Sequence, residues 1–228
     1  MHEASKTHRI RGADFVPRYF KDKAVLDIGC GADLVVPWAE PFDLADGDAN
    51  QIASILPPLS YDVVHSSHCL EHMLSPPDAL AQWWSLVRPG GFLITVVPDE
   101  EMYEQGLWPS LFNHDHKWAF TLDPRRLWGA HVLDLKALHL GLPGATLIDL
   151  QKHDAGYRHD LHGATRRNLS AVNFSRYRRA LAAVRKFRLE WLGLDLVGWT
   201  WLTRHGIPID QTQKDAMAQL QIIMQKRA

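Results

Sequence analysis

The chain has 228 residues, of which 46% are hydrophobic and 22% are charged, so it is long enough to bury one substantial core. The formal net charge is -1 at pH 7, which argues against nucleic acid or an anionic membrane as the main partner. The two cysteines, Cys30 and Cys69, are too few for a disulfide framework, and no apolar run of about 18 residues occurs. We therefore expect a cytoplasmic protein with neither a secretion signal nor a membrane span.

Residues 1–22 are polar at first and then aromatic, ending in FVPRYFKDK. Two interpretations are open. The segment is either a loosely held surface tail, as chain ends commonly are, or a short amphipathic segment packed on the core or lying over a ligand. The surface tail is the favoured interpretation.

The stretch that organises the chain is VLDIGCGAD, residues 25–33. Aliphatic residues flank an acidic one and run into Gly-Cys-Gly, which is the pattern of a buried parallel strand that ends in a tight turn. Glycine belongs in such a turn because a positive φ and close backbone approach both exclude a Cβ. The sequence therefore predicts a ligand-binding turn at the end of the first strand.

The connection after this turn is unusually short. Residues 32–40 contain Pro37 and allow at most about two helical turns, whereas a parallel crossover normally takes about a dozen residues. PFDL, residues 41–44, is the end of a second strand with Asp43 at its carboxyl edge. Residues 44–60 are too few for a further helix, strand and loop, so we expect the outermost strand on this side to be lost or vestigial.

Further strands are indicated by β-branched and aromatic runs between turn signals. They are residues 61–68 (YDVVHSSH), 92–98 (FLITVVP), 145–153 (ATLIDLQKH) and 218–226 (AQLQIIMQK). Helical spacing and capping residues predict helices over residues 76–87, 121–142 and an amphipathic one within 168–192. Residues 99–120 form a loop-like stretch rich in polar and aromatic side chains, and loops of that length are usually functional.

Four segments now occur in the order of a known family: the Gly-Cys-Gly turn, YDVV, CLEH and RPGG. Together they resemble the class I S-adenosylmethionine-dependent methyltransferases of the methyltransferase type 11-like kind, over most of residues 23–154. The resemblance implies an α/β fold with a doubly wound, mostly parallel, Rossmann-like sheet. Here one edge would be trimmed and the last strand would be antiparallel. It also implies methyl transfer, with S-adenosylmethionine as the cofactor.

On this basis we divide the chain into four parts. They are an N-terminal segment (1–22), the methyltransferase core (23–154), a helical insertion (155–208) and the last strand of the core (209–228).

The resemblance also implies a set of cofactor-binding residues. They are Asp27, Gly29, Cys30, Gly31, Asp43, Asp48, Ala49, Ser67 and His68. Asp27, Gly29 and Gly31 would line the methionine part. Asp43 would bind the ribose hydroxyls, while Asp48 and Ala49 would hold the adenine. Ser67 and His68 would cover the cofactor with their backbone. The alternative for Asp43 and Asp48 is that they are ordinary turn acids, and an exchange of their two roles is also open.

A dinucleotide-dependent oxidoreductase is the competing interpretation of the glycine turn. That fingerprint requires G-x-G-x-x-G opening a helix that receives a pyrophosphate, but Leu34 stands at the third glycine position. S-adenosylmethionine carries no phosphate and has a positive sulfonium, so it gains from nearby acids. The acids around the turn therefore favour the sulfonium cofactor.

Candidates for the acceptor side lie in NHDHK, residues 113–117, which is similar to segments in methyltransferases that act on small molecules and glycans. We select His116 as a base or acceptor contact, with His114 and Asp115 behind it; a structural histidine is the alternative. A base is needed mainly when the acceptor is a hydroxyl. The Asn-Pro-Pro-Tyr motif of amine methylation is absent, so oxygen on a small molecule or glycan is the favoured acceptor.

One motif points to a different chemistry. His68-Cys-Leu-Glu71-His72 matches H-x-x-E-H, a zinc-peptidase signature whose histidines must share a helix face. A strand ends at His68 and Ser75-Pro-Pro follows, so at most one turn of helix fits. We therefore expect a loop that closes the pocket and no metal site.

The insertion is locally basic, because arginines and lysines outnumber acids between residues 156 and 204. A solvated helix face explains this without any function. The functional interpretation is a site for an anionic acceptor, since arginine pairs with phosphate in a bidentate manner. From another class of function, the alternative is a non-catalytic methyltransferase-like binding module in a biosynthetic complex. The oligomeric state is not predicted.

Overall fold

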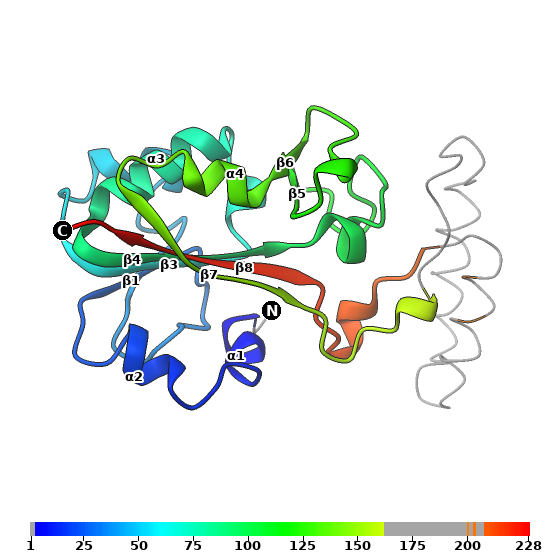
Figure 1. Cartoon of the computed structure of the whole chain (residues 1–228), viewed down its shortest axis with the longest axis horizontal. Helices are drawn as coiled ribbons and strands as arrows, with labels where there is room; N and C mark the ends of the chain where they lie inside the picture. The colour runs from blue at the N-terminus through cyan, green and yellow to red at the C-terminus, as the bar shows by residue number, and fades with distance from the viewer. Residues whose placement is uncertain (1–2, 162–199, 201–202, 204–207) are drawn as a thin grey trace.

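The computed structural model describes residues 3–161, 200, 203 and 208–228. Its centre is a six-stranded sheet with the order β2-β1-β3-β4-β8-β7 (Figure 1). The strands are β1 (Val25–Ile28), β2 (Glu40–Phe42), β3 (Tyr61–Ser67), β4 (Val87–Pro98), β7 (Ala145–His153) and β8 (Gln219–Lys226). The predicted amphipathic helix within residues 168–192, and most of the basic insertion, lie outside the described residues.

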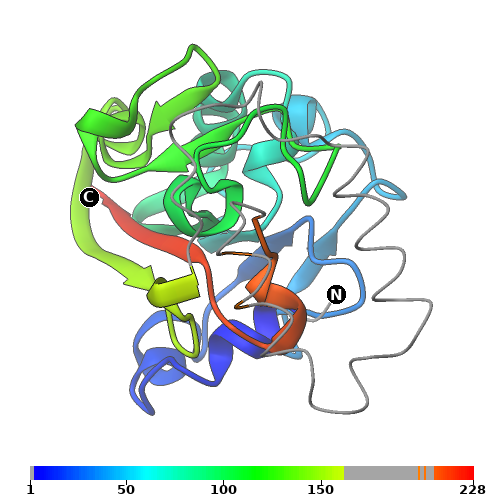
Figure 2. The ribbon, with the colours of Figure 1, turned by 90° about the vertical axis from the view of Figure 1, so that its right-hand side faces the viewer.

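Strand direction confirms the predicted fold class. The pairings β2-β1, β1-β3 and β3-β4 are parallel, whereas β8 is antiparallel to both β4 and β7. Figure 2 shows β8 and β7 side by side. The short helix η8 (Gln211–Lys214) precedes β8, and η5 (His159–Leu161) follows β7. The other edge of the sheet ends at β2, with no further strand paired there in the described part of the chain, as the short segment of residues 44–60 predicts.

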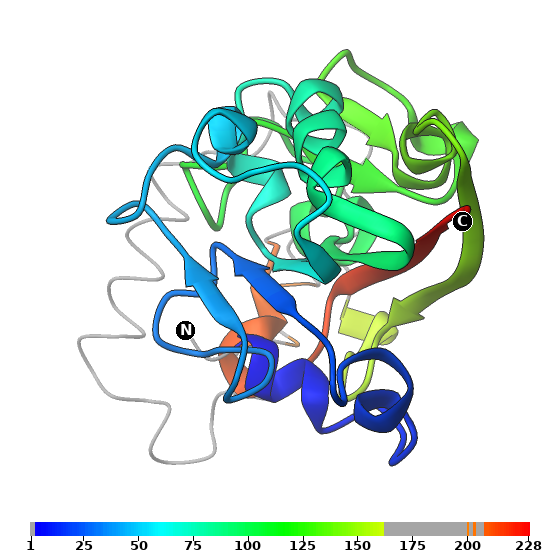
Figure 3. The same ribbon diagram turned by 90° about the vertical axis from the view of Figure 1, so that its left-hand side faces the viewer.

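Side-chain alternation along the strands builds a core on each face of the sheet. Leu26 and Val64 belong to one buried cluster, and their neighbours Val25 and Val63 belong to the other. Helices α3 (Pro76–Leu86) and α4 (Leu135–Leu140) cover the first face, and α1 (Glu3–His8) and α2 (Phe15–Tyr19) lie on the opposite side (Figures 1 and 3). The carboxyl ends of the parallel strands therefore open between two covered faces.

The N-terminal segment packs on the core, so its interpretation as a surface tail is wrong. Tyr19 and Phe20 are buried in the same cluster as Val25. The Ser5 backbone N–H donates to Asp33 Oδ2 at 2.9 Å, which fastens α1 to the loop after β1. Aromatic residues that pack against the sheet explain why the segment is ordered.

The predicted helix over residues 121–142 is also wrong. The chain instead forms β5 (Ala119–Thr121), the single turn η4 (Pro124–Arg126), β6 (Val132–Asp134) and then α4. Strands β5 and β6 pair in parallel as a small second sheet. Two carboxylates explain the division, because Asp123 accepts from Arg125 N and Asp134 accepts from Ala137 N, so each caps a new helix start.

Residues 99–120 are largely the loop that the sequence predicts, because residues 105–118 form no helix or strand. The π-helical turn η3 (Glu100–Glu104) precedes this loop, and β5 follows it. Two further short helices lie near the carboxyl ends of strands: η1 (Ala49–Ser54) follows the short β2, and η2 (Leu70–His72) follows β3. Among the predicted site residues, Asp48 caps η1, Ala49 begins it, and Ser67 and His68 precede η2.

Candidate functional site

The glycine turn stands at the carboxyl end of β1. Gly29 has φ +72° and Gly31 has φ +56°, both in the left-handed region that favours glycine. A Cβ on Gly29 would also lie 2.7 Å from Cβ and Sγ of Cys69, so close packing excludes any side chain. At Gly31 an added Cβ would meet nothing within 4 Å, so the backbone there faces open space. The turn is therefore packed on one side and open on the other.

Asp43 lies against this turn. Its Oδ2 accepts from the Gly31 backbone N–H at 2.6 Å, and its Oδ1 accepts from the Leu44 N–H at 2.7 Å. The parallel register of β1 and β2, with Ile28 opposite Phe42, brings the two strand ends together. Each carboxylate oxygen keeps a free lone pair. The structure thus places a half-exposed acceptor group beside the glycine turn, where the sequence predicts one.

Asp27 supports the same turn from inside the protein. It is 1% exposed, its Oδ2 accepts from Val35 N–H at 2.7 Å, and its Oδ1 is 2.6 Å from His65 Nδ1. Burial lowers the pKa of His65, and the Asp27 carboxylate opposes that shift. Because both carboxylate oxygens are bonded within the protein, Asp27 holds the loop after β1 in place. Its direct contact with a ligand stays a prediction.

Asp48 and Ala49 lie at the start of η1. The Asp48 Oδ1 accepts from Asn50 N–H at 2.9 Å and from Asn50 Nδ2 at 2.7 Å. These hydrogen bonds hold the pKa of the exposed Asp48 carboxyl below its usual range. The Ala49 carbonyl accepts from Trp83 Nε1 at 2.9 Å, which anchors η1 to α3. Their predicted contact with an adenine is not tested by these bonds.

Ser67 and His68 end β3 next to the glycine turn. The Ser67 hydroxyl is buried without a hydrogen-bond partner among the described residues. His68 has φ +54°, and its Nε2 lies 3.0 Å from Gln219 Oε1. Because β3 pairs with β1 in parallel, with Ser66 opposite Ile28, these residues share the edge that carries Gly29 and Asp43. Cys30 lies in the turn itself, and burial raises the pKa of its thiol.

A second group of side chains surrounds Glu71 in η2. Glu71 is 1% exposed, and neither of its carboxylate oxygens has a hydrogen-bond partner in the described part of the chain. Three imidazole nitrogens approach its Oε1: His68 Nδ1 at 3.6 Å, His116 Nε2 at 3.9 Å and His72 Nε2 at 4.0 Å. Burial by itself raises the pKa of Glu71, but the histidines, His68 foremost, lower it below its usual range.

His116 reaches this group because the chain around it is tied to η2. The backbone N–H groups of Lys117 and Trp118 both donate to the Glu71 carbonyl, at 2.9 and 3.2 Å. The Trp118 indole N–H donates to the Met73 carbonyl at 2.9 Å. Residues 113–118 are therefore fixed beside η2 although about 45 residues separate the two segments in sequence.

The Nδ1 atoms of His116 and His72, which lie on the ring side away from Glu71, also have partners. His116 Nδ1 lies 2.7 Å from Glu104 Oε1, and His72 Nδ1 donates to the Asp115 carbonyl at 3.1 Å. Asp115 thus contributes its backbone, while the side chains of Asp115 and His114 belong to exposed residues. Of the three predicted acceptor-side residues, His116 is the one that the structure brings into the buried group.

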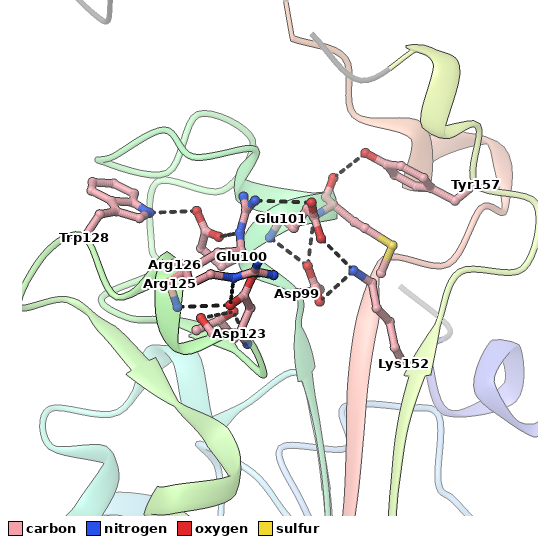
Figure 4. Close-up of polar contacts among 11 residues, drawn as sticks. Asp99, Glu100, Glu101, Asp123, Arg125, Arg126, Trp128, Lys152 and Tyr157 are labelled. Carbon is pink, nitrogen blue, oxygen red and sulfur yellow. Dashed lines mark hydrogen bonds and ion pairs between the residues drawn. The ribbon is translucent and has the colours of Figure 1, made fainter. Parts of the chain in front are cut away.

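Glu104 is positioned by the polar network around η3 (Figure 4). The Asp99 Oδ1 caps η3 by accepting from Glu101 N–H at 2.7 Å and Met102 N–H at 3.0 Å. Lys152 Nζ lies 2.9 Å from Glu101 Oε2 and 3.5 Å from Asp99 Oδ2. Burial lowers the pKa of Lys152, but the two carboxylates outweigh it and raise the pKa overall.

A second part of this network holds the first residue of η3. Glu100 accepts from the Arg126 guanidinium and, through Oε1, from Trp128 Nε1 at 2.8 Å (Figure 4). The Tyr157 hydroxyl donates to the Met102 carbonyl at 2.9 Å. Five side chains from four parts of the chain thus fix η3, which carries Glu104 against His116.

Sequence reasoning missed Glu71 and Glu104 as members of the site. The CLEH segment was a usable signal for Glu71, because a glutamate next to histidines at the end of a strand is available for binding. Nothing in the local sequence marks Glu104, since its partner His116 stands in another segment. Two hollows of about 290 and 310 Å³ in the described structure border α1 or α2, and none of the predicted site residues lines them.

The sequence matches a family of methyltransferase domains over residues 4–134, more than half of the chain. The chain belongs to this methyltransferase domain family. It is a class I S-adenosylmethionine-dependent methyltransferase, as the glycine turn, YDVV, CLEH and RPGG segments imply. No curated protein matches the sequence.

Solved structures share the fold. A S-adenosylmethionine-dependent methyltransferase from Archaeoglobus fulgidus is 15% identical, with 99% of this chain and 95% of that chain covered and a TM-score of 0.51. The YcgJ protein from Bacillus subtilis is 12% identical, with both chains covered over 100% and a TM-score of 0.50. At these identities the likeness concerns the fold alone. No described helix of the methyltransferase is long and apolar enough to cross a membrane.

The residues at the glycine turn fit the cofactor, S-adenosylmethionine. Open space in front of Gly31 lets a ligand approach the backbone, and the Asp43 carboxylate beside it can accept from hydroxyl groups. Ser67, whose buried hydroxyl has no partner among the described residues, ends β3 at the same edge of the sheet. The cofactor carries a positive sulfonium, which acids stabilise electrostatically.

Proposed function

We propose that this methyltransferase transfers the methyl group to an oxygen atom of a small molecule or a glycan. The observation that carries the proposal is the cluster of buried Glu71, buried His116 and partly exposed His72 at η2, which follows β3. The same strand ends with Ser67 at the cofactor edge, so an acceptor held by this group would lie close to the cofactor. Hydroxyl acceptors differ from amines in that they must lose a proton to become nucleophilic.

The ring orientations support a role in receiving that proton. A carboxylate accepts hydrogen bonds, so His116 donates from Nδ1 to Glu104 and its Nε2 carries a lone pair in the neutral ring. That Nε2 faces Glu71, inside the buried group. The tautomer follows from the hydrogen-bond partner. His116 would accept the hydroxyl proton, and Glu104 would stabilise the resulting imidazolium.

Orientation of the acceptor relative to the cofactor would supply much of the rate acceleration of methyl transfer. The cofactor, when bound, supplies a methyl group already activated by the sulfonium. The chain then has to align the acceptor oxygen with that group and exclude water. Gly29, Gly31 and Asp43 would hold the cofactor, with Asp48, Ala49 and Cys30 as further proposed contacts to it. Ser67 and His68 would lie between the cofactor and the acceptor.

The proposed domains would differ in function. Residues 23–154 and 209–228 would carry cofactor binding and the buried group, and residues 155–208 would select the acceptor. The excess of arginines in that insertion supports an anionic acceptor, such as a phosphorylated glycan.

The test is methyl transfer from isotope-labelled S-adenosylmethionine to a panel of sugars, anionic glycans, phenols and amines, with products identified by mass spectrometry. We expect a methyl ether, and His116→Ala should lower turnover about 100-fold while cofactor affinity is unchanged. Methylation of nitrogen alone would contradict the proposal. If His114→Ala lowers turnover and His116→Ala does not, the assignment of His116 is wrong. Cofactor binding without turnover on any acceptor would instead favour a non-catalytic binding module.

A further inference from the structure

Two imidazole nitrogens approach the Glu71 carboxylate without a hydrogen bond to it. The Asp115 carbonyl can only accept, so His72 donates from Nδ1 and its Nε2 is unprotonated in the neutral ring. His116 has the same tautomer because of Glu104. In these neutral rings both bare nitrogens lie near a carboxylate that is 1% exposed. That arrangement of three lone pairs is electrostatically unfavourable, and a bound cation would stabilise it.

The distances leave room for such a cation. The contacts from Glu71 Oε1 to His72 Nε2 and His116 Nε2 are 4.0 and 3.9 Å, too long for N–H···O hydrogen bonds. One ligand atom from each of the three residues can be chosen so that all lie within 4.8 Å of one another. Ligands about 2.0–2.2 Å from a tetrahedral zinc ion are about 3.3–3.6 Å apart, so a contraction of at most about 1.5 Å would close the site.

We propose that Glu71, His72 and His116 bind a divalent transition-metal ion of the zinc type. Two imidazoles and one carboxylate favour zinc, manganese or iron over magnesium and calcium, which prefer oxygen ligands. Three protein ligands leave positions open for an exogenous oxygen, as in catalytic metal sites. The outer contacts also fit, because ligating histidines usually donate their second N–H to a carboxylate or a carbonyl. Here Glu104 and the Asp115 carbonyl serve as those acceptors.

A zinc site built on His68 and His72 would need both histidines on one helix, so the sequence predicts no metal site. The structure removes that requirement by supplying a ligand from a distant segment. His116 arrives beside η2 through the backbone bonds of Lys117 and Trp118 to Glu71. His68, at 3.6 Å from the same carboxylate oxygen, borders the site from the cofactor side.

The inference rests on the proposed methylation of an oxygen atom, and it replaces the proton-accepting role of His116 by that of a metal ligand. With the ion bound, His116 Nε2 is a ligand, so it no longer takes the proton. An acceptor hydroxyl that coordinates the ion loses its proton to water more readily, because a bound cation lowers the pKa of a coordinated O–H group. The O–H bond breaks, its electron pair stays on oxygen as a metal-bound alkoxide, and the proton leaves to solvent.

The experiment is a calorimetric titration of the metal-stripped full chain with zinc chloride, and in parallel with manganese and magnesium chloride. We expect one equivalent of zinc to bind, with magnesium at least 100-fold weaker. Glu71→Gln and His116→Ala should each weaken zinc binding at least 100-fold, and Glu104→Gln about 10-fold or more. His159→Ala is the matched control, because His159 is an exposed histidine paired with Asp154, and it should leave zinc affinity unchanged.

Absence of stoichiometric zinc binding by the wild-type chain would overturn the inference, as would a folded Glu71→Gln variant with wild-type affinity. Cobalt substitution of the wild-type chain gives a measurement that needs no variant. Visible d–d bands of a four- or five-coordinate site would support the inference, and a spectrum of hydrated cobalt alone would overturn it. Methylation confined to nitrogen by a zinc-loaded chain would defeat the proposed function and leave the metal site standing.

Discussion

Gly29 and Gly31 tolerate no ordinary side chain for two different reasons. Both have positive φ, which costs an L-residue about 1 kcal/mol or more. Gly29 also packs against Cys69, so that a Cβ would lie 2.7 Å from the Cys69 Sγ, whereas a Cβ on Gly31 would project into open space. The first glycine therefore serves packing as well as conformation, and the second serves the approach of a ligand.

Alanine at these two positions should separate the two effects. Gly29→Ala should destabilise the fold by about 2–3 kcal/mol through strain and overpacking, and should weaken cofactor binding at least tenfold. Gly31→Ala should cost about 1 kcal/mol and weaken cofactor binding by steric exclusion. Gly12→Ala is the control, because an added Cβ there meets nothing within 4 Å. Urea unfolding and calorimetry measure both quantities. Equal cofactor affinity in all three variants would refute the assignment of the turn.

His139 is a buried titratable residue away from the predicted site. Its Nδ1 donates to the Leu135 carbonyl at 2.8 Å, and its Nε2 lies 3.0 Å from Thr95 Oγ1. Burial lowers the pKa of His139 to about 4, against about 6.5 in an unfolded chain. The folded structure therefore stabilises the neutral His139 ring relative to the protonated one.

The sign of the pH dependence follows from that depressed pKa. Above pH 6.5 the His139 ring is neutral in both the folded and the unfolded chain. As the pH falls from 6.5 toward 4, the ring is protonated in the unfolded chain but stays neutral in the folded chain. The free energy of unfolding should thus fall by about 2 kcal/mol between pH 7 and pH 5 on account of this residue. His139→Asn should flatten that slope by the same amount in urea unfolding at each pH. An unchanged slope would show that His139 does not titrate this way.

At the scale of elements, short helical turns place the candidate site residues. The turn η2 holds Glu71, η1 begins at Ala49, and η3 carries Glu104 against His116. Each follows a strand end, where parallel sheets leave space between the connections. The single carboxylate of Asp99 caps η3 and also contacts Lys152, so this residue governs the orientation of the element.

Removal of the Asp99 cap should affect chemistry more than cofactor binding. Asp99→Ala leaves two backbone N–H groups of η3 without their acceptor and should cost about 1–2 kcal/mol of stability. Turnover should fall because Glu104 no longer orients His116, while cofactor affinity stays within about twofold. Asp99→Asn, which keeps a capping oxygen, should recover most of the stability. Asp134→Ala, which removes the cap of α4, is the control. Equal loss of turnover in Asp134→Ala would contradict this positioning role.

Over the whole molecule, the sequence predicts those structural features that depend on local residue patterns. Alternating apolar residues predict the strands, and the shortage of residues between 44 and 60 predicts the trimmed edge of the sheet. The pattern over residues 121–142 misleads, because Asp123 and Asp134 each start a new element and Val132 pairs with β5. The contact between Glu71 and His116 depends on tertiary packing of segments about 45 residues apart, so no local pattern shows it. Asp43 is predictable because strand order alone places it beside Gly31.

Cofactor binding at the glycine turn decides most, because the proposed methylation of an acceptor depends on it. The most direct measurement is calorimetric titration of the wild-type chain with S-adenosylmethionine and with S-adenosylhomocysteine. We expect one site per chain for each ligand, with micromolar affinity typical of enzyme cofactors and substrates, and loss of that site in Gly29→Ala. If neither ligand binds, or if Gly29→Ala binds as tightly as the wild-type chain, the glycine turn is not the cofactor site.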